Sequence, residues 1–324
     1  MIQPPIEPQQ LWNLSKDNFL SISRLVFEWQ AQHNQVYKQW VNLNNAAANQ
    51  LTSIPFLPIS FFKTQEVLIG PTPDTLFESS GTTQDVVSKH WIQDTHLYEQ
   101  SFLNCFNLFY GAPSNYCILG LLPSYLERAH SSLVYMVEKL IQASGHPESG
   151  FYLADFKKLD TVLKNLEAQK KPVWLIGVSF ALTDFAEAFP QNLKYTTVIE
   201  TGGMKGRKKE LTREELHQHL STNLGTPHIQ SEYGMTELLS QAYAIQEGVF
   251  KCPPWMKVLV ADEEDPIALK ETGKGVLHII DLANLYSCSF IATEDLGEVY
   301  ADGSFKVIGR VDASQRRGCS LLVV

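Results

Sequence analysis

Four hydroxyl side chains surround one glycine in the segment Ser79-Ser80-Gly81-Thr82-Thr83. Hydroxyls and backbone N–H groups are neutral hydrogen-bond donors, and a glycine lets the backbone come close to a bound anion. We expect a helix to follow directly after this segment. The segment therefore predicts a loop that wraps phosphate, with an ordinary surface loop as the alternative.

A second segment, residues 231–237, carries an aromatic ring, a hydroxyl and a carboxylate at close spacing. These groups belong to Tyr233, Thr236 and Glu237, with Gly234 among them. The residues before them, 227–230, are predicted to form a strand, and open α/β sheets bind ligands where their strands end. The segment predicts one wall of a ligand site. The alternative is a strand-to-helix connection capped by Thr236.

Two further segments near the end of the chain carry an acid and a base. Asp295 ends the run Thr-Glu-Asp before an expected turn at Gly297, and Arg310 and Asp312 follow the last expected hairpin. A carboxylate can accept hydrogen bonds from both hydroxyls of a ribose, and an arginine can donate to the same hydroxyls. The alternative is a turn aspartate and a surface ion pair.

Composition limits the classes of protein that could hold these segments. The chain has 324 residues, of which 44% are hydrophobic and 19% charged, which suits one large lobed domain or two domains. Its net charge of −9 disfavours a nucleic-acid partner. The longest apolar run, 173–182, is too short for a bilayer span of about 20 residues, and no secretory signal is visible. Five cysteines without a CxxC pair favour a reducing compartment, so we expect a cytoplasmic protein.

The positions of apolar residues predict the elements that hold these segments. Leu159, Val162, Leu163 and Leu166 share one helical face, and the spacing of Thr212 and Glu215 is that of a capping box at a helix start. Further elements are expected as follows: strands at 172–178 and 196–200, and a helix at 179–189. This alternation is typical of a parallel sheet covered on both faces.

The two ends of the chain have different patterns. Trp12, Leu20, Ile22, Leu25 and Trp29 have roughly helical spacing and predict an N-terminal helical cap. From residue 256 onward the pattern is of short strands separated by turns, which predicts a β-rich lobe. The expected strands are 256–261, 275–280, 298–300 and 305–308, the last two joined by a hairpin at Asp302 and Gly303.

Taken in order, these segments resemble the adenylate-forming superfamily of acyl-CoA synthetases, luciferases and peptide-synthetase adenylation domains. Residues 79–83 look like its phosphate loop, 233–237 like its adenine-and-magnesium motif, 293–295 like its ribose motif and 309–312 like its hinge. Glu200-Thr-Gly202-Gly203 looks like the strand and glycines that line its adenine pocket. The resemblance covers about residues 77–318. The branch it resembles most is the acyl-protein synthetases of bacterial luminescence, through the runs 122–128 and 131–135.

The resemblance implies a fold and a division of the chain. The fold is α/β, the large N-terminal domain of adenylate-forming enzymes, with two helix-covered sheets and a small β-barrel-like lobe. Residues 1–250 would form the α/β region that binds nucleotide and acyl group, and 251–309 the β-rich lobe. Residues 310–324 would be a hinge remnant, with the family's C-terminal domain and its catalytic lysine absent.

The resemblance also implies roles for individual residues, with ATP and Mg²⁺ as cofactors. The catalytic residues would be Thr82, Thr236, Glu237 and Cys319, and Glu237 would also ligate the metal. The nucleotide-binding residues would be Ser79, Ser80, Gly81, Thr83, Gly202, Gly203, Tyr233, Gly234, Asp295 and Arg310. His130 and Gly177 would lie beside the acyl group, and Asp312 would be the hinge.

This sequence departs from the family pattern at the phosphate loop. The family continues Gly-x-Pro-Lys where this chain has Gln84-Asp85-Val86-Val87, and Lys89 comes two positions late. The middle glycine of the ribose motif is Glu294. Because adenylation depends on positioning and charge neutralisation rather than on a protein base, we expect the missing lysine to slow the reaction without abolishing it. Lys205 is a candidate substitute.

The resulting hypothesis is an AMP-forming ligase that activates a carboxylic acid, expected to be a fatty acid, as an acyl-adenylate. The acyl group would then pass to a thiol: Cys319, which lies near Arg316 and Arg317, a partner protein, or CoA. The sequence leaves open which acid and acceptor are used and whether the chain forms a homo- or hetero-oligomer.

Two other functions remain open at this point. The chain could be a non-catalytic adenylate-binding scaffold or partner subunit. It could also be a serine hydrolase, because Gly-Val-Ser179-Phe-Ala follows a strand and precedes a helix, as a nucleophile elbow does. His228 or His278 would then serve as the base.

Overall fold

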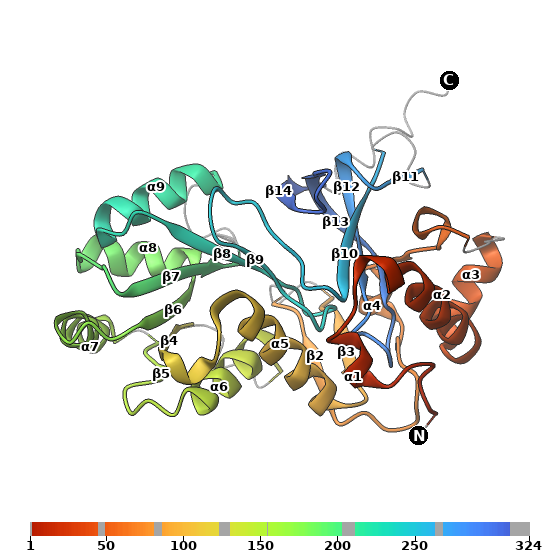
Figure 1. Cartoon of the computed structure of the whole chain (residues 1–324), viewed down its shortest axis with the longest axis horizontal. Helices are drawn as coiled ribbons and strands as arrows, with labels where there is room; N and C mark the ends of the chain where they lie inside the picture. The colour runs from red at the N-terminus through yellow and green to blue at the C-terminus, as the bar shows by residue number, and fades with distance from the viewer. Residues whose placement is uncertain are drawn as a thin grey trace.

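A computed structural model of the chain describes residues 2–44, 49–80, 86–122, 130–153, 155–202, 211–262 and 268–311. These residues form a parallel sheet with helices around it, a curled sheet at the C-terminal end, and a short hairpin (Figure 1). The mixed α/β architecture with a curled half-barrel confirms the predicted fold class.

The parallel sheet has the strand order β5-β4-β6-β7-β8-β9, and only β9 runs antiparallel to its neighbour. Its strands are β4 (Cys117–Leu121), β5 (Gly150–Phe151), β6 (Val173–Val178), β7 (Thr196–Thr201), β8 (Ile229–Tyr233) and β9 (Ala242–Ala244). All residues of β4 and β6 are buried, as expected for strands covered on both faces.

Helices cover both faces of this sheet. Figure 1 shows α8 and α9 on one face and α5 and α6 on the other. The helices in this region are α5 (Thr95–Tyr110), α6 (Ser132–Ser144), α7 (Phe156–Ala168), α8 (Ser179–Ala188) and α9 (Arg213–Leu224). Thr212 caps α9 with the predicted capping box, and the four predicted apolar residues of α7 are its buried face. These local predictions are confirmed.

The curled sheet, called here the barrel sheet, has the strand order β1-β13-β12-β10-β11, with β14 also paired to β13. Its strands are β1 (Leu57–Pro58), β10 (Met256–Ala261), β11 (Leu269–Lys270), β12 (Gly273–Asp281), β13 (Phe290–Val299) and β14 (Phe305–Arg310). Register shifts at Val276/His278 and at Leu296/Gly297 interrupt the pairing. Such bulges bend a strand and strengthen its twist, which suits a curled sheet.

Two sequence predictions about turns in this sheet have different outcomes. The predicted hairpin at Asp302 and Gly303 is present, with Gly303 at a φ of 88°. The turn predicted at Gly297 is wrong, because β13 runs through this position without a break. A Cβ on Gly297 would lie 2.3 Å from the Lys306 carbonyl oxygen, so this glycine permits close strand pairing.

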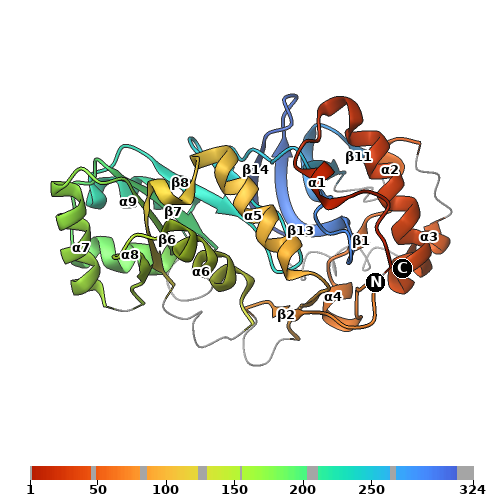
Figure 2. The same cartoon turned by 60° about the horizontal axis from the view of Figure 1, so that its bottom comes forward.

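The N-terminal helices pack against the barrel sheet, except the last of them, which packs against His90. These helices are α1 (Pro8–Leu11), α2 (Lys16–His33), α3 (Gln35–Asn44) and α4 (Phe61–Thr64), and Figure 2 shows α2 and α3 on the opposite side of the molecule from α7 and α8. Tyr37 stacks on Phe290 of β13 at 6.0 Å. The predicted helix is present, but Leu20 and Leu25 are exposed, and Phe19, Val26 and Phe27 are buried instead. The proposed division of the chain at residue 250 stays a prediction.

The hairpin of β2 (Thr75–Glu78) and β3 (Lys89–Ile92) flanks the hydroxyl-rich segment. The helix expected directly after that segment is therefore wrong: β3 comes first, and α5 begins only at Thr95. Among the described residues, no helix is long and apolar enough to cross a membrane.

Candidate functional site

Three of the sequence-predicted residues meet at Asp295. The hydroxyl of Tyr233, the last residue of β8, donates to Asp295 Oδ2 at 2.7 Å, and Arg310 Nε donates to Asp295 Oδ1 at 3.0 Å. Asp295 and Arg310 are register partners on β13 and β14, which explains their contact. Asp295 is 5% exposed, so both of its oxygens have partners in a nearly dry setting. The fold thus brings together residues from three separate motifs.

The ring of Tyr233 packs against the rings of two phenylalanines. Its centroid lies 5.7 Å from that of Phe250 and 5.4 Å from that of Phe305, and Tyr233 is 8% exposed. Burial, and then the charge of Asp295, raises the pKa of Tyr233 well above its usual value. The phenol therefore stays protonated and acts as a donor. Little of the ring is open for stacking on a base.

Glu237 is a buried carboxyl with few partners. It is 5% exposed, and burial raises its pKa, while a hydrogen bond from Ser88 and the charges of Arg310 and Lys63 act in the opposite direction. These opposing contributions do not outweigh the desolvation. A cation placed beside this carboxyl would be favoured, because it would stabilise the ionised form.

The backbone of the Thr236–Glu237 pair is fixed by two buried side chains that the sequence analysis did not identify. Asn284 Nδ2 donates to the Glu237 carbonyl oxygen at 2.9 Å. His90 Nδ1 lies 2.8 Å from the Thr236 carbonyl oxygen, and since a carbonyl only accepts, Nδ1 carries the proton. Burial lowers the pKa of His90 to about 4, so the ring is neutral. The sequence pattern predicted a helix in this region, and His90 carried no signal of its own.

The described part of the hydroxyl-rich segment lies at the end of the hairpin where β2 ends and β3 begins. The Ser79 backbone N–H donates to the Ser88 carbonyl at 3.0 Å, and the Ser88 N–H donates to Ser79 Oγ at 2.9 Å. Since Ser88 also contacts Glu237, this end of the hairpin adjoins the second motif. Ser80 ends this described stretch of the chain. The predicted residues outside the described part are Gly81, Thr82, Thr83, Gly203, Lys205, Asp312 and Cys319.

The remaining predicted residues lie at other places. Gly202 directly follows β7, with a φ of 70° and open space where a side chain would be. A Cβ on Gly234 would clash with Glu232 Oε1. His130 precedes α6 and donates from Nδ1 to the Leu76 carbonyl at 3.1 Å. Gly177 lies in β6, where a Cβ would meet Leu182 at 2.7 Å. Because Gly177 has no side chain, α8 can pack closely against β6. This packing role is separate from the acyl-binding role predicted for Gly177.

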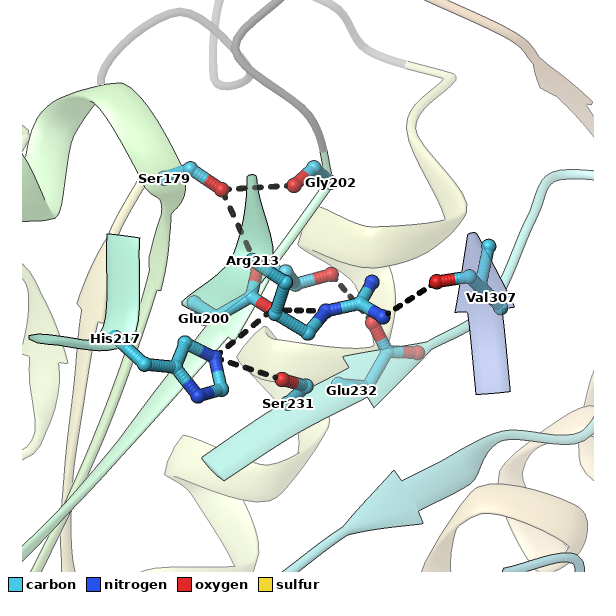
Figure 3. Close-up of polar contacts among 9 residues, drawn as sticks. Ser179, Glu200, Gly202, Arg213, His217, Ser231, Glu232 and Val307 are labelled. Carbon is cyan, nitrogen blue, oxygen red and sulfur yellow. Dashed lines mark hydrogen bonds and ion pairs between the residues drawn. The ribbon is translucent and has the colours of Figure 1, made fainter. Parts of the chain in front are cut away.

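A second polar cluster surrounds Glu200 at the end of β7 (Figure 3). Glu200 Oε1 lies 3.3 Å from Arg213 Nε and 3.5 Å from His217 Nε2. Glu200 is 3% exposed, yet its pKa is lowered, because a hydrogen bond from His217 and the charge of Arg213 outweigh desolvation. Arg213 also donates from Nη1 to the Val307 carbonyl of β14 at 3.1 Å. It therefore connects the parallel sheet to the barrel sheet.

Ser179 belongs to this cluster, and its contacts with the described residues are not those of a nucleophile. It opens α8 directly after β6, as an elbow serine would. Its hydroxyl lies 2.8 Å from the Gly202 carbonyl oxygen and 3.2 Å from Glu200 Oε2, and both of these groups are acceptors. A hydrolase needs a histidine at hydrogen-bond distance from the serine. His278 contacts the Val276 carbonyl instead, and His228 is exposed. This arrangement does not support the hydrolase hypothesis.

Candidate metal ligands and thiols are two further kinds of reactive group in the described residues. Within the described ranges, no group of three or more His, Cys, Asp or Glu residues could hold a metal ion. A site with one buried carboxylate, such as Glu237, suits Mg²⁺ that is shared with phosphate oxygens. The described cysteines are Cys105, Cys117, Cys252 and Cys288, all free, and burial raises the pKa of each thiol.

Solved structures with a similar fold include enzymes that bind ATP. ATP-bound MatB from Rhodopseudomonas palustris is 19% identical with a TM-score of 0.55, over 72% of this chain and 47% of that chain. An ATP-bound RpMatB-BxBclM chimera is 18% identical with a TM-score of 0.56, over 75% and 49%. A long-chain-fatty-acid-CoA ligase (FadD1) from Archaeoglobus fulgidus is 15% identical with a TM-score of 0.50, over 76% and 53%.

At these identities the likeness establishes the fold, and the chain spans about half the length of these structures. A search of curated protein sequences found no match. The profile of one protein family, described as "Acyl-protein synthetase, LuxE", matches residues 133–324, which is more than half of the chain. The match includes Tyr233, Glu237, Asp295 and Arg310. The chain belongs to the LuxE acyl-protein synthetase family, whose fold is that of the adenylate-forming enzymes.

Proposed function

We propose that the chain uses ATP to activate a carboxylic acid as an acyl-adenylate and passes the acyl group to a thiol. The observation that carries this proposal is the contact of Tyr233, Asp295 and Arg310, which joins three motifs at one buried carboxylate. Asp295 would accept hydrogen bonds from the ribose hydroxyls, and Arg310 would orient its carboxylate. Tyr233 would fix the same carboxylate from the side of the parallel sheet.

Glu237 would hold Mg²⁺. Its buried carboxyl has few partners, and Mg²⁺ usually takes one or two protein carboxylates together with substrate phosphates. When bound, the ion would neutralise charge on the phosphates. His90 and Asn284 would keep Thr236 and Glu237 in place, because each fixes one carbonyl of that pair.

The first chemical step needs no protein base, because the substrate carboxylate is already a nucleophile. One of its oxygens attacks the α-phosphorus of ATP, a new P–O bond forms, and the bond to the leaving pyrophosphate breaks. Thr236, which follows the strand end at Tyr233, would contact the α-phosphate. Alignment of the two reactants can contribute about 7–11 kcal/mol to such a step.

The second step would transfer the acyl group to a thiol. A thiolate attacks the acyl carbon, and AMP leaves with the bonding electrons of the C–O bond. The described cysteines have raised pKa values and are poor thiolates. We therefore keep Cys319, which lies near two arginines in the sequence, as the acceptor to test, with a partner protein or CoA as the other acceptors.

The acceptor can be tested with radiolabelled fatty acid and ATP. If Cys319 receives the acyl group, the wild-type chain becomes labelled, hydroxylamine removes the label, and Cys319→Ser stays unlabelled. Cys252→Ser, the least buried of the described cysteines, is the matched control and should label normally. Equal labelling of Cys319→Ser would exclude this acceptor.

The activation step can be tested by ATP–pyrophosphate exchange with a panel of carboxylic acids of increasing chain length. We expect exchange that depends on the acid, is highest with fatty acids, and is lost in Glu237→Gln. Glu271→Gln, which removes an exposed carboxylate of a surface ion pair, is the control. Nucleotide binding without exchange for any acid would favour the non-catalytic scaffold.

A further inference from the structure

A hollow of about 480 Å³ lies beside the hairpin that flanks the hydroxyl-rich segment. One wall is formed by α4 and the residues after it, including Lys63 and Glu66, and the other by Val86, Val87 and Lys89 around the start of β3. Two lysines and one glutamate therefore face the same space. The hollow is open to solvent and is large enough for two phosphate groups.

Lys63 is held near the second motif by the residue before it. Phe62 is fully buried, and its ring meets the edge of the His90 ring with centroids 5.4 Å apart. His90 in turn donates to the Thr236 carbonyl. The helix that carries Lys63 is thus packed against the side chain that fixes the Thr236–Glu237 pair. This packing fixes the position of the Lys63 backbone, although the Lys63 side chain is exposed.

The charges around Glu237 leave Lys63 as the available cation. Among the described residues, Arg310 and Lys63 are cationic groups whose charges act on the Glu237 carboxyl. Arg310 is already paired with Asp295 at 3.0 Å. Lys63 forms no ion pair with any residue that the structure describes. An anion bound between Glu237-held magnesium and the hollow would therefore meet the charge of Lys63.

We infer that Lys63 and the hollow bind the terminal phosphates of ATP, and the pyrophosphate that they become. This inference rests on the proposed function for its ligand. The cation would come from the N-terminal segment, outside the stretch that resembles the adenylate-forming motifs. It would replace the lysine that the phosphate-loop pattern lacks at 84–87. Lys89 would add a second, weaker contribution from the opposite wall.

Calorimetric binding at 0.15 M salt with Mg²⁺ tests this inference, using ATP, adenosine and inorganic pyrophosphate as separate probes. We expect Lys63→Met to weaken ATP and pyrophosphate binding about tenfold or more, because a charge-assisted contact is lost. Adenosine binding should stay within twofold, and Lys63→Arg should retain most of the ATP affinity. Lys38→Met, an exposed lysine of the same N-terminal segment, should change none of these values.

The outcomes separate this inference from the proposed function. If Lys63→Met weakens ATP and adenosine equally, or weakens neither, the inference is wrong. If the wild-type chain shows no acid-dependent exchange but Lys63→Met still weakens ATP and pyrophosphate selectively, the proposed function fails and the phosphate site stands. If the wild-type chain binds neither ATP nor pyrophosphate, both fail.

Discussion

Two buried glutamates of this chain have opposite electrostatic surroundings. Glu200 contacts Arg213 and His217, and these partners lower its pKa although it is almost fully buried. Glu237 is buried to a similar degree, but its pKa stays raised because its partners do not compensate for desolvation. The first carboxylate is neutralised by the protein itself. The second keeps a desolvation cost that a bound cation would offset, as we propose for Mg²⁺.

The largest expected effect comes from Glu237→Gln. If Glu237 holds Mg²⁺, we expect the exchange rate to fall by roughly 10²–10³, the usual cost of removing one well-placed electrostatic group. The fold should not be destabilised. A carboxyl with a raised pKa costs stability once the pH exceeds its ordinary value of 4.5, and glutamine removes that cost.

Exchange kinetics measure the activity of Glu237→Gln, and urea unfolding at pH 7.5 measures its stability separately. A loss of activity that is accompanied by a loss of stability would mean that Glu237 is structural, like Glu200. The comparison between the two carboxylates would then fail.

The next largest effect is on stability, from Arg213→Met. This change leaves Glu200 buried beside His217 without its arginine and breaks the bond to the Val307 carbonyl of β14. We expect a loss of about 2–3 kcal/mol in the free energy of unfolding. Lys164→Met, which removes an exposed i,i+4 ion pair with Asp160, should cost less than about 0.5 kcal/mol.

Replacement of both partners, Arg213→Met with Glu200→Leu, should recover much of the stability lost in Arg213→Met. An apolar pair leaves no unpaired charge in the interior. If the double variant is no more stable than Arg213→Met alone, Glu200 is not the source of the cost.

A smaller effect is expected at Glu232, the residue before Tyr233. Burial, and then the charge of Glu200, raises the pKa of Glu232 to about 7, although Thr201 donates a hydrogen bond to it. Ionisation of this group therefore lowers stability as the pH rises from 4.5 to about 7. Glu232→Gln should be more stable than wild type above pH 7, by on the order of 1 kcal/mol. Below pH 4.5 the two should be equal, and a difference that does not vary with pH would contradict this account.

The smallest effect is expected from Tyr233→Phe, which removes the hydrogen bond to Asp295 and keeps the ring between Phe250 and Phe305. One such bond contributes about 1 kcal/mol, so ATP affinity should fall about fivefold. Tyr300→Phe, on the surface near the last hairpin, serves as the control. Unchanged affinity for ATP in Tyr233→Phe would show that Asp295 does not depend on this bond.

The sequence predicted the elements whose signals are local. The capping box of α9 and the apolar face of α7 are confirmed because both depend on residues within a few positions of each other. The expected turn at Gly297 was wrong because this glycine allows close contact with Lys306 of β14 and Leu277 of β12, the two strands that neighbour β13. The helix expected after the hydroxyl-rich segment was wrong for a related reason: β3 forms by pairing with β2.

The residues of the candidate site show the same difference between local signals and contacts that join separate segments. Tyr233, Glu237, Asp295 and Arg310 could be identified from residue type and motif order, and the fold brings three of them into direct contact. His90, Arg213 and Lys63 were not identified, because their positions depend on contacts between segments more than 90 residues apart or on packing by a neighbour. The pattern of residues within a single segment does not predict such contacts.

The central claim, that a carboxylate attacks the α-phosphorus of ATP, is tested most directly with an acid labelled with ¹⁸O in both carboxyl oxygens. The chain is incubated with this acid, ATP, Mg²⁺ and a thiol acceptor, and the nucleotide and phosphate products are analysed by mass spectrometry. Our account predicts one ¹⁸O atom in each AMP and none in pyrophosphate. Label in inorganic phosphate together with ADP, or AMP without label, would contradict it.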